Sequence, residues 1–327
     1  MLSIPCNLCG ADDYRVRFEA GRAQSARIVE CRACGLLYAN PRTRPPDFVL
    51  AREADPDIIE QVCGRIDRAT KERLQVRDYA RTRAFLARRF PERGALFEVG
   101  AGYGYLLDYF RQDGWRVSGI EPNEGLTRFA ARTLGIGIEP SILPEMAGDA
   151  EPYDVVLLMH VIEHVPDPAE TLGAIFRLLR PGGMLVLETP RYDTLMFRLL
   201  GRRERSLACE GHIYFFTSRT LREIAARAGF AIEHAEKVGR SLTVDRLAMN
   251  LGVVLRSARL GKALRKAARR LGVGDFAMTI NLRDMERIYL TRPRHPGRAT
   301  PAATPHDPGR RGGNTRHAAV DNSGKSA

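Results

Sequence analysis

The sequence predicts an α/β fold: a mostly parallel sheet with helices on both faces, preceded by a small N-terminal zinc ribbon. From residue 95 onward, apolar strand-like runs alternate with helical patterns of about ten to fifteen residues, which is typical of parallel sheets. Two Cys-x2-Cys pairs, each followed by a glycine, precede that region and predict the ribbon. With 327 residues, the chain is long enough to bury a core of this kind.

Two short cysteine knuckles lie within the first 44 residues. Their four thiols belong to Cys6, Cys9, Cys31 and Cys34. Four thiolates at this spacing suit tetrahedral zinc, and a site closed by four protein ligands is structural rather than catalytic. Four unrelated buried cysteines are the alternative, which the paired spacing and paired glycines disfavour. Cys63 and Cys209 are isolated, and we expect both to be small buried apolar residues.

The chain is expected to divide into four segments. They are a zinc ribbon over 1–44, a helical linker or cap over 45–90, a main domain over 91–291 with a basic helical insertion at about 240–275, and a disordered basic tail over 292–327. Prolines in the stretch ANPRTRPPD close the ribbon with a rigid linker, because they fix φ and remove backbone donors.

Apolar periodicity gives the expected elements in order. The predicted strands cover 95–100, 115–122, 153–160, 184–190 and 231–239, with an edge strand expected within 276–293. The predicted helices cover about 56–90, then 105–114, 125–135, 168–183 and 217–230.

Composition and charge limit the class of protein. A chain that is 44% hydrophobic and 28% charged fits a globular protein, and no apolar run approaches the length of about eighteen residues that a membrane helix needs. The N-terminus shows no secretory signal pattern, so the cytoplasm is the expected compartment. The net charge is +12, but seven Lys or Arg against two Asp place a net +5 from Arg292 onward. That tail has few large apolar residues and is expected to be disordered.

The stretch FEVGAGYG at 97–104 places three glycines in five positions, directly after an apolar run. A phosphate-binding P-loop requires Gly-Lys-Ser/Thr at the start of the helix, but here Tyr105 follows Gly104. A dinucleotide fingerprint requires a glycine at its sixth position, which is also Tyr105. The spacing is instead G-x-G-x-G, and it follows the acid Glu98.

These residues resemble the first motif of the class I S-adenosylmethionine-dependent methyltransferases. Three further segments occur in that family's order: GIEP at 119–122, MHVIEHVPDP at 159–168 and RLLRPGGMLVLETP at 177–190. The second of these is similar to the small-molecule branch, which includes the methyltransferases of ubiquinone biosynthesis. The resemblance covers roughly residues 75 to 290. It implies a Rossmann-like, seven-stranded, mostly parallel sheet with the cofactor cleft at the carboxyl ends of the strands.

The resemblance also implies which residues bind the S-adenosylmethionine. The implied cofactor-binding residues are Glu98, Gly100, Ala101, Gly102, Tyr103, Gly104, Glu121, Pro122, Met159 and His160. The bare glycine backbone would let the donor's amino-acid part lie against the loop, and Glu121 would accept the ribose hydroxyls. Tyr103 can place its ring near the sulfonium, or it can simply pack.

Methyl transfer needs alignment first and a catalytic base only for some acceptors. A neutral histidine at the rim of the cleft suits proton removal near neutral pH. His160 is the first catalytic candidate by position, and His212 is the second because related methyltransferases carry a similar segment near the acceptor. We expect Glu163 and His164 to orient the turn after residue 160 and to cap the next helix.

The acceptor is expected to be a small molecule, a sugar or a lipid-linked glycan. The N-terminal ribbon resembles that of bacterial methyltransferases of sugar and polysaccharide biosynthesis. The segments that would cover the cleft are 45–90, 191–215 and 240–275, and none contains a decodable motif. The alternatives are a nucleic-acid methyltransferase, which the few ribbon aromatics disfavour, and a noncatalytic zinc-ribbon binding protein.

A basic stretch at 255–273 contains seven bases and no acid. On a helix, Leu260, Leu264 and Leu271 share one face, and bases such as Lys262 and Lys266 share another. This pattern suits the surface of an anionic membrane, or else an ordinary amphipathic helix that packs over the cleft with a solvated basic side.

Overall fold

The computed structural model describes residues 2–21, 26–42, 68–143, 152–201, 207, 211–254 and 257–294. Residues Met1–His295 form one compact unit. The part of the predicted helix before residue 68, Cys63, Cys209 and the expected disorder of the tail from residue 295 onward lie outside the described residues.

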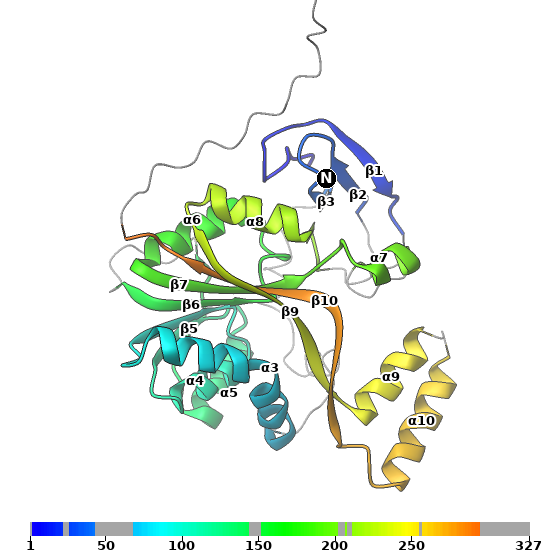
Figure 1. Cartoon of the computed structure of the whole chain (residues 1–327). Coiled ribbons are helices and arrows are strands. Elements are labelled where there is room, and N and C mark those ends of the chain that lie inside the picture. Colours follow the sequence, from blue (N-terminus) through cyan, green and yellow to red (C-terminus); the bar gives the residue numbers. More distant parts are fainter. Residues whose placement is uncertain are drawn as a thin grey trace, which may run out of the picture. The chain divides into compact units, whose positions relative to one another are not determined.

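A six-stranded sheet organises this unit (Figure 1). Its strands lie in the order β5 (Arg116–Ile120), β4 (Ala95–Val99), β6 (Tyr153–Met159), β7 (Leu179–Pro190), β10 (Ala277–Thr291) and β9 (Ala231–Thr243). The first four are parallel, and β10 runs antiparallel to both β7 and β9. Most of strand β6 and residues 184–187 of β7 read as continuous apolar runs because both faces of a parallel sheet are covered.

Helices cover both faces of the sheet, as predicted. Helices α3 (Arg68–Arg89), α4 (Tyr105–Arg111) and α5 (Glu124–Leu134) lie on one side, and α6 (Pro168–Leu178) and α8 (Ser218–Arg227) lie on the other (Figure 1). Alternate strand residues enter different apolar clusters: Leu96 packs in one and Phe97 in the other. Successive side chains of a strand point to opposite faces, so one apolar run supplies both cores.

Three details differ from the sequence prediction. The expected seven-stranded sheet has six strands in the described part, and beyond β5 only a single parallel bridge joins Ile120 to Glu139. Pro140 directly follows this bridge, and proline cannot donate to a strand ladder. The predicted helix over 168–183 ends at Leu178, because the residue before Pro181 is disfavoured in helical conformation, and the remainder begins β7.

The third difference concerns residues 276–293, where we expected an edge strand. Instead β10 is internal, since β7 pairs with one side of it and β9 with the other. The first half of β10 is mostly exposed, as in an edge strand, whereas residues 285–290 are buried, as in an internal strand.

The N-terminal residues form a second sheet with strands β1 (Tyr14–Phe18), β2 (Ile28–Cys31) and β3 (Leu37–Ala39). A fourth strand, β8 (Tyr214–Phe215), joins it from the segment between β7 and α8, pairing Leu37 with Phe215. The ribbon therefore shares a sheet with a segment that directly follows His212.

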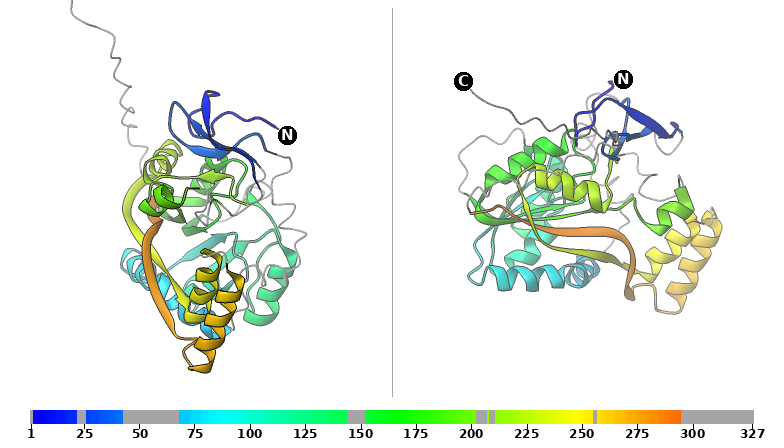
Figure 2. Two further views of the ribbon diagram at one scale, coloured as in Figure 1. Left: turned by 90° about the vertical axis from the view of Figure 1, so that its right-hand side faces the viewer. Right: turned by 45° about the horizontal axis from the view of Figure 1, so that its top comes forward.

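Two further elements complete the described chain. A short helix, α7 (Leu195–Leu200), follows β7, and a helical hairpin of α9 (Val244–Val254) and α10 (Ala258–Arg270) connects β9 to β10 (Figure 2). Among the described helices, none combines the length and the apolar character that crossing a bilayer requires.

Candidate active site

The glycine loop connects the end of β4 to the start of α4. Gly100, Gly102 and Gly104 all have positive φ, at 72°, 55° and 77°, a region that favours glycine. A Cβ at Gly100 would lie 2.6 Å from Val161 Cγ2, and one at Gly104 would lie 3.0 Å from Ile138 Cδ1. A Cβ at Gly102 would meet nothing within 4 Å. The loop is therefore packed at both ends and open in its middle, as a cradle for a ligand requires.

Glu121 lies across this loop, at the carboxyl end of β5. The backbone N–H of Gly102 donates to its Oε2 at 2.9 Å, and that of Asn123 donates to Oε1 at 3.1 Å. Burial raises the pKa of Glu121, although these two N–H groups act in the opposite direction. The carboxylate is thus held beside the open side of the loop, where it can also accept hydroxyl protons.

Glu98 is a buried carboxyl group at the end of β4. It is only 4% exposed, and its Oε2 has no hydrogen-bond partner. Burial, and then the nearby Glu121, raise the pKa of Glu98 well above its usual value. A buried carboxylate oxygen without a partner is costly unless a ligand satisfies it. Together with the open glycine cradle, it fits the cationic amino end of S-adenosylmethionine.

The other proposed donor contacts surround this loop. Ala101 is buried, and Met159 is buried at the end of β6. Pro122 is partly exposed directly after Glu121. The ring of Tyr103 packs edge-on against Phe129 with their centroids 5.0 Å apart. This packing contact explains the position of the Tyr103 ring. That the ring lies near the sulfonium of the donor stays a prediction.

His160 follows β6 and has a positive φ of 58°, which is uncommon for a residue with a side chain. Its Nε2 lies 3.0 Å from Glu188 Oε1, and its Nδ1 lies 3.8 Å from Glu163 Oε1. Arg240 Nη2, from β9, lies 3.2 Å from Nε2. The side chain is 30% exposed, so His160 is the accessible member of this charged group.

The two carboxylates favour the protonated form of this histidine. Burial and Arg240 act to lower the pKa of His160, but Glu163 and Glu188 outweigh them, so that its pKa is raised. Burial opposes ionisation of Glu163 as well, yet His160 and the other nearby histidines lower its pKa to about 2. Burial also opposes ionisation of Glu188, whose pKa is lowered chiefly by Arg287. His160 therefore stays protonated to a higher pH than an ordinary histidine, whereas the sequence suggested a neutral base near neutral pH.

The sequence motifs did not indicate Glu188, Arg240 or Arg287. Arg287 is 1% exposed on β10, and its Nη2 lies 2.6 Å from Glu188 Oε2. Its Nη1 donates to Thr82 Oγ1 at 2.8 Å. The available signal was charged residues inside two otherwise mostly apolar strands: Glu188 in LVLETP, and Glu286 and Arg287 in MERIYL.

His212 lies near the opposite side of Glu163. It is 8% exposed, and its Nδ1 is 3.4 Å from Tyr192 Oη. His164 has its Nδ1 2.7 Å from the carbonyl oxygen of Gly211, and ligand atoms of Glu163, His164 and His212 all lie within 4.8 Å of one another. The two candidate histidines, His160 and His212, thus flank one buried carboxylate.

The expected helix cap after this turn is wrong in one respect. Asp167, not Glu163 or His164, caps α6, because its side chain accepts from the backbone N–H of Glu170. The backbone oxygen of Glu163 instead accepts from Ile213, which ties the turn to the segment after His212.

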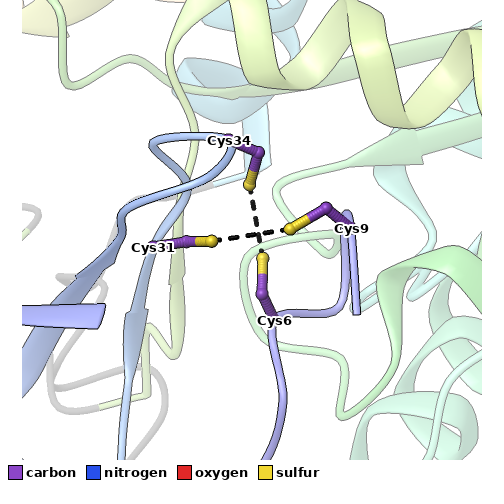
Figure 3. Close-up of side chains that lie close together, drawn as sticks. All are labelled: Cys6, Cys9, Cys31 and Cys34. Atoms are coloured by element: carbon purple, nitrogen blue, oxygen red, sulfur yellow. Dashed lines mark hydrogen bonds between the residues drawn. The ribbon is translucent and has the colours of Figure 1, made fainter. Parts of the chain in front are cut away.

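The four knuckle cysteines converge on one point (Figure 3). The sulfurs of Cys6 and Cys34 are 3.4 Å apart, and those of Cys9 and Cys31 are 3.5 Å apart. Zinc–sulfur bonds of about 2.3 Å in a tetrahedron place sulfurs roughly 3.8 Å apart, so the cluster nearly has the required size. Each knuckle is closed by a glycine N–H that donates to the first cysteine's carbonyl, at 2.7 Å and 2.8 Å.

Comparisons with known proteins agree with this geometry. A family model described as "Methyltransferase domain" matches residues 70–235, just over half of the chain. The ubiquinone biosynthesis O-methyltransferase of Caulobacter vibrioides is 37% identical over 110 residues, which cover 32% of this chain and 44% of that protein. The protein of the same name from Aeromonas salmonicida is 35% identical over 100 residues, covering 29% and 42%. The chain thus spans less than half the length of these curated relatives.

Solved structures give more distant similarities. A possible histamine N-methyltransferase from Thermotoga maritima has a TM-score of 0.44 at 20% identity, covering 68% of this chain and 90% of that one. The magnesium protoporphyrin IX methyltransferase from Synechocystis has a TM-score of 0.47 at 16% identity, covering 75% and 99%. By the match of the family model to more than half of its length, the chain belongs to the methyltransferase-domain family.

Proposed function

We propose that this enzyme binds S-adenosylmethionine along the loop 100–104 and transfers the methyl group to a small-molecule, sugar or lipid-linked glycan acceptor beside His160. The observation that carries the proposal is the contact between the two loops: Gly100 packs so closely on Val161 that a Cβ would lie 2.6 Å from it. Because β4 and β6 are parallel neighbours, the donor loop and His160 emerge at the same edge of the sheet.

In this proposal the donor supplies an activated methyl group, and the chain's own residues position the reactants. Glu98 binds the donor's amino group, and Glu121 binds the ribose hydroxyls. Alignment of the acceptor atom with the methyl carbon supplies much of the rate acceleration. In its neutral form, which is populated above its raised pKa, His160 receives the acceptor's proton when the acceptor is a hydroxyl. Its cationic neighbour Arg240 favours an acceptor oxygen that carries negative charge.

The curated relatives support a hydroxyl acceptor, since both are named as ubiquinone biosynthesis O-methyltransferases. We also propose that Cys6, Cys9, Cys31 and Cys34 hold a structural zinc ion. The number, element and separation of the four sulfurs support this, and a closed tetrahedral site leaves no position for chemistry.

Replacing Glu121 with alanine is expected to weaken S-adenosylmethionine binding by about 10- to 150-fold. Hydrogen bonds to a charged group contribute about 1.5–3 kcal/mol, which corresponds to that range. Calorimetric titration of the purified protein with S-adenosylmethionine measures the change. Glu124→Ala is the matched control, because Glu124 is an exposed carboxylate three residues later that pairs only with Arg128 among the ion pairs of the described residues.

Two outcomes would contradict the donor site. One is an unchanged dissociation constant for Glu121→Ala, and the other is equal weakening by Glu124→Ala. Far-ultraviolet circular dichroism of each variant separates loss of binding from loss of fold.

The role of His160 has its own test. Glu163→Gln removes one carboxylate that favours the protonated histidine, so the pKa of His160 falls and the acid limb of kcat/KM moves to lower pH. The glutamine carbonyl can still accept from Thr189 Oγ1, which limits structural damage. His160→Gln is expected to lower kcat by about 10² to 10⁴ with donor affinity unchanged.

The control for this test is His234→Gln, since His234 is an exposed histidine on β9. An unmoved pH profile in Glu163→Gln, with kcat retained in His160→Gln, would exclude proton transfer by His160.

A further inference from the structure

The hairpin of α9 and α10 extends from the ends of the long strands β9 and β10 (Figures 1 and 2). Its two helices cross at glycines: a Cβ at Gly252 would lie 2.8 Å from the Cα of Gly261. Helix α10 packs chiefly against α9. The hairpin is therefore held together by close backbone contact, and most of the outer side of α10 is left to solvent.

The exposed side of α10 is strongly cationic. Its six bases are Arg259, Lys262, Arg265, Lys266, Arg269 and Arg270, and the helix contains no acid. Asp245 on α9 pairs with Arg265 at 3.3 Å and with Arg269 at 2.6 Å. None of the other four takes part in an ion pair among the described residues. A hollow of about 470 Å³ along the helix is lined by five of these bases, all but Arg259.

Exposed large apolar side chains directly follow these bases along the chain. In the turn from α10 to β10, Leu271 is 75% exposed, Val273 is 44% exposed and Phe276 is 62% exposed. Leu260, within α10, is also exposed. Adjacent exposed apolar side chains usually mark a surface that binds something. Bases beside exposed leucine and phenylalanine fit the boundary of an anionic bilayer, where phosphates meet acyl chains.

We propose that this hairpin docks the enzyme on the surface of an anionic lipid bilayer. Leu271, Val273 and Phe276 enter the headgroup boundary, and the bases without acidic partners contact lipid phosphates. The exposed apolar turn favours lipid over nucleic acid, because the charged phosphodiester backbone provides no apolar surface against which a leucine side chain can be buried. An ordinary amphipathic helix with a solvated basic side would explain the bases, but it would not explain the exposed leucine, valine and phenylalanine of this turn. The inference does not depend on the acceptor or on the role of His160.

The experiment is co-sedimentation of the full chain with phosphatidylcholine vesicles, with and without phosphatidylglycerol. The wild-type protein is expected to bind only the vesicles that contain phosphatidylglycerol. Changing Lys262, Lys266 and Arg270 together to glutamine is expected to weaken binding about a hundredfold, since each base near an anionic surface contributes about a factor of five. Leu271→Ser with Phe276→Ser is expected to weaken it at least about tenfold.

The matched control changes three exposed bases elsewhere, Arg88, Arg116 and Arg132, to glutamine. This control keeps the same total charge as the hairpin variant and leaves the basic tail intact. Equal weakening by the control, or wild-type binding by the hairpin variant, would overturn the proposal. Binding to a DNA duplex without binding to vesicles would overturn it in favour of a nucleic-acid surface. Titration with S-adenosylmethionine on every variant separates these outcomes from loss of the donor site or of the fold.

Discussion

Replacing Cys31 with serine is expected to abolish binding of the zinc ion that we propose for the four cysteines, and to unfold the N-terminal ribbon. Serine is not a zinc ligand of this kind, and structural zinc contributes about 10–16 kcal/mol of binding free energy in small zinc domains. The ribbon strands have only three to five residues, so they cannot supply a comparable apolar core. Zinc content by atomic absorption and the heat-unfolding profile measure the effect.

The effect of this substitution should reach the acceptor side of the active site. Strand β3 pairs with β8, two residues after His212, and Arg219 on α8 donates to the carbonyl oxygen of Cys34. Arg42 Nη2 donates to the carbonyl oxygen of Pro166 at 2.7 Å. An unfolded ribbon removes these contacts from the segments around His164 and His212. We therefore expect the KM for the acceptor to rise while the Kd for S-adenosylmethionine stays within about threefold, because the glycine loop makes none of these contacts.

The control is Cys63→Ser, which removes a thiol outside the four-cysteine cluster. Zinc content that is unchanged in Cys31→Ser would contradict the metal site. Equal losses of donor and acceptor binding would contradict the proposed link between the ribbon and the acceptor side, because they would show that the whole protein had unfolded.

The sequence predicted those features that short-range patterns encode. The glycine spacing after an apolar run predicted the loop at 100–104, and the four cysteines of the two Cys-x2-Cys pairs lie together as expected. The alternation of strands and helices predicted the parallel part of the sheet. Such patterns work because each depends on neighbouring residues: turn geometry, ligand spacing and burial of one segment.

The charged cluster behind His160 could not be predicted this way. Glu188 and Arg287 are 99 residues apart, and they meet only because β10 inserts beside β7 in the sheet. The same insertion turned the expected edge strand into an internal one. Strand β8 joins the ribbon for a similar reason, since its two residues carry no periodicity of their own. Contacts between residues on distant strands can be predicted only once the order of the strands in the sheet is known.

Replacing Arg287 with methionine is expected to lower the free energy of unfolding by about 3–5 kcal/mol, because it removes the fully buried cation that pairs with Glu188 and leaves that carboxylate paired with the partly exposed His160. Arg287 is 1% exposed and also lies 3.7 Å from Glu236. Urea unfolding measures the change. Combining Arg287→Met with Glu188→Gln should restore part of the loss, since no buried charge is then left uncompensated. If both variants lose the same free energy, packing rather than charge explains the effect.

The pH dependence distinguishes these causes further. Arg287 lowers the pKa of Glu188, so the stability that this carboxylate contributes is present above its unfolded pKa near 4.5 and is lost as the pH falls through the folded value. His160 behaves oppositely: its raised pKa gives stability that is complete below 6.5 and is lost as the pH rises through the folded value. In Arg287→Met the pKa of Glu188 rises, so a proton can replace the missing cation. The gap in stability between Arg287→Met and the wild-type protein should therefore be largest near neutral pH and should narrow on acidification, whereas a loss of packing alone would be the same at every pH.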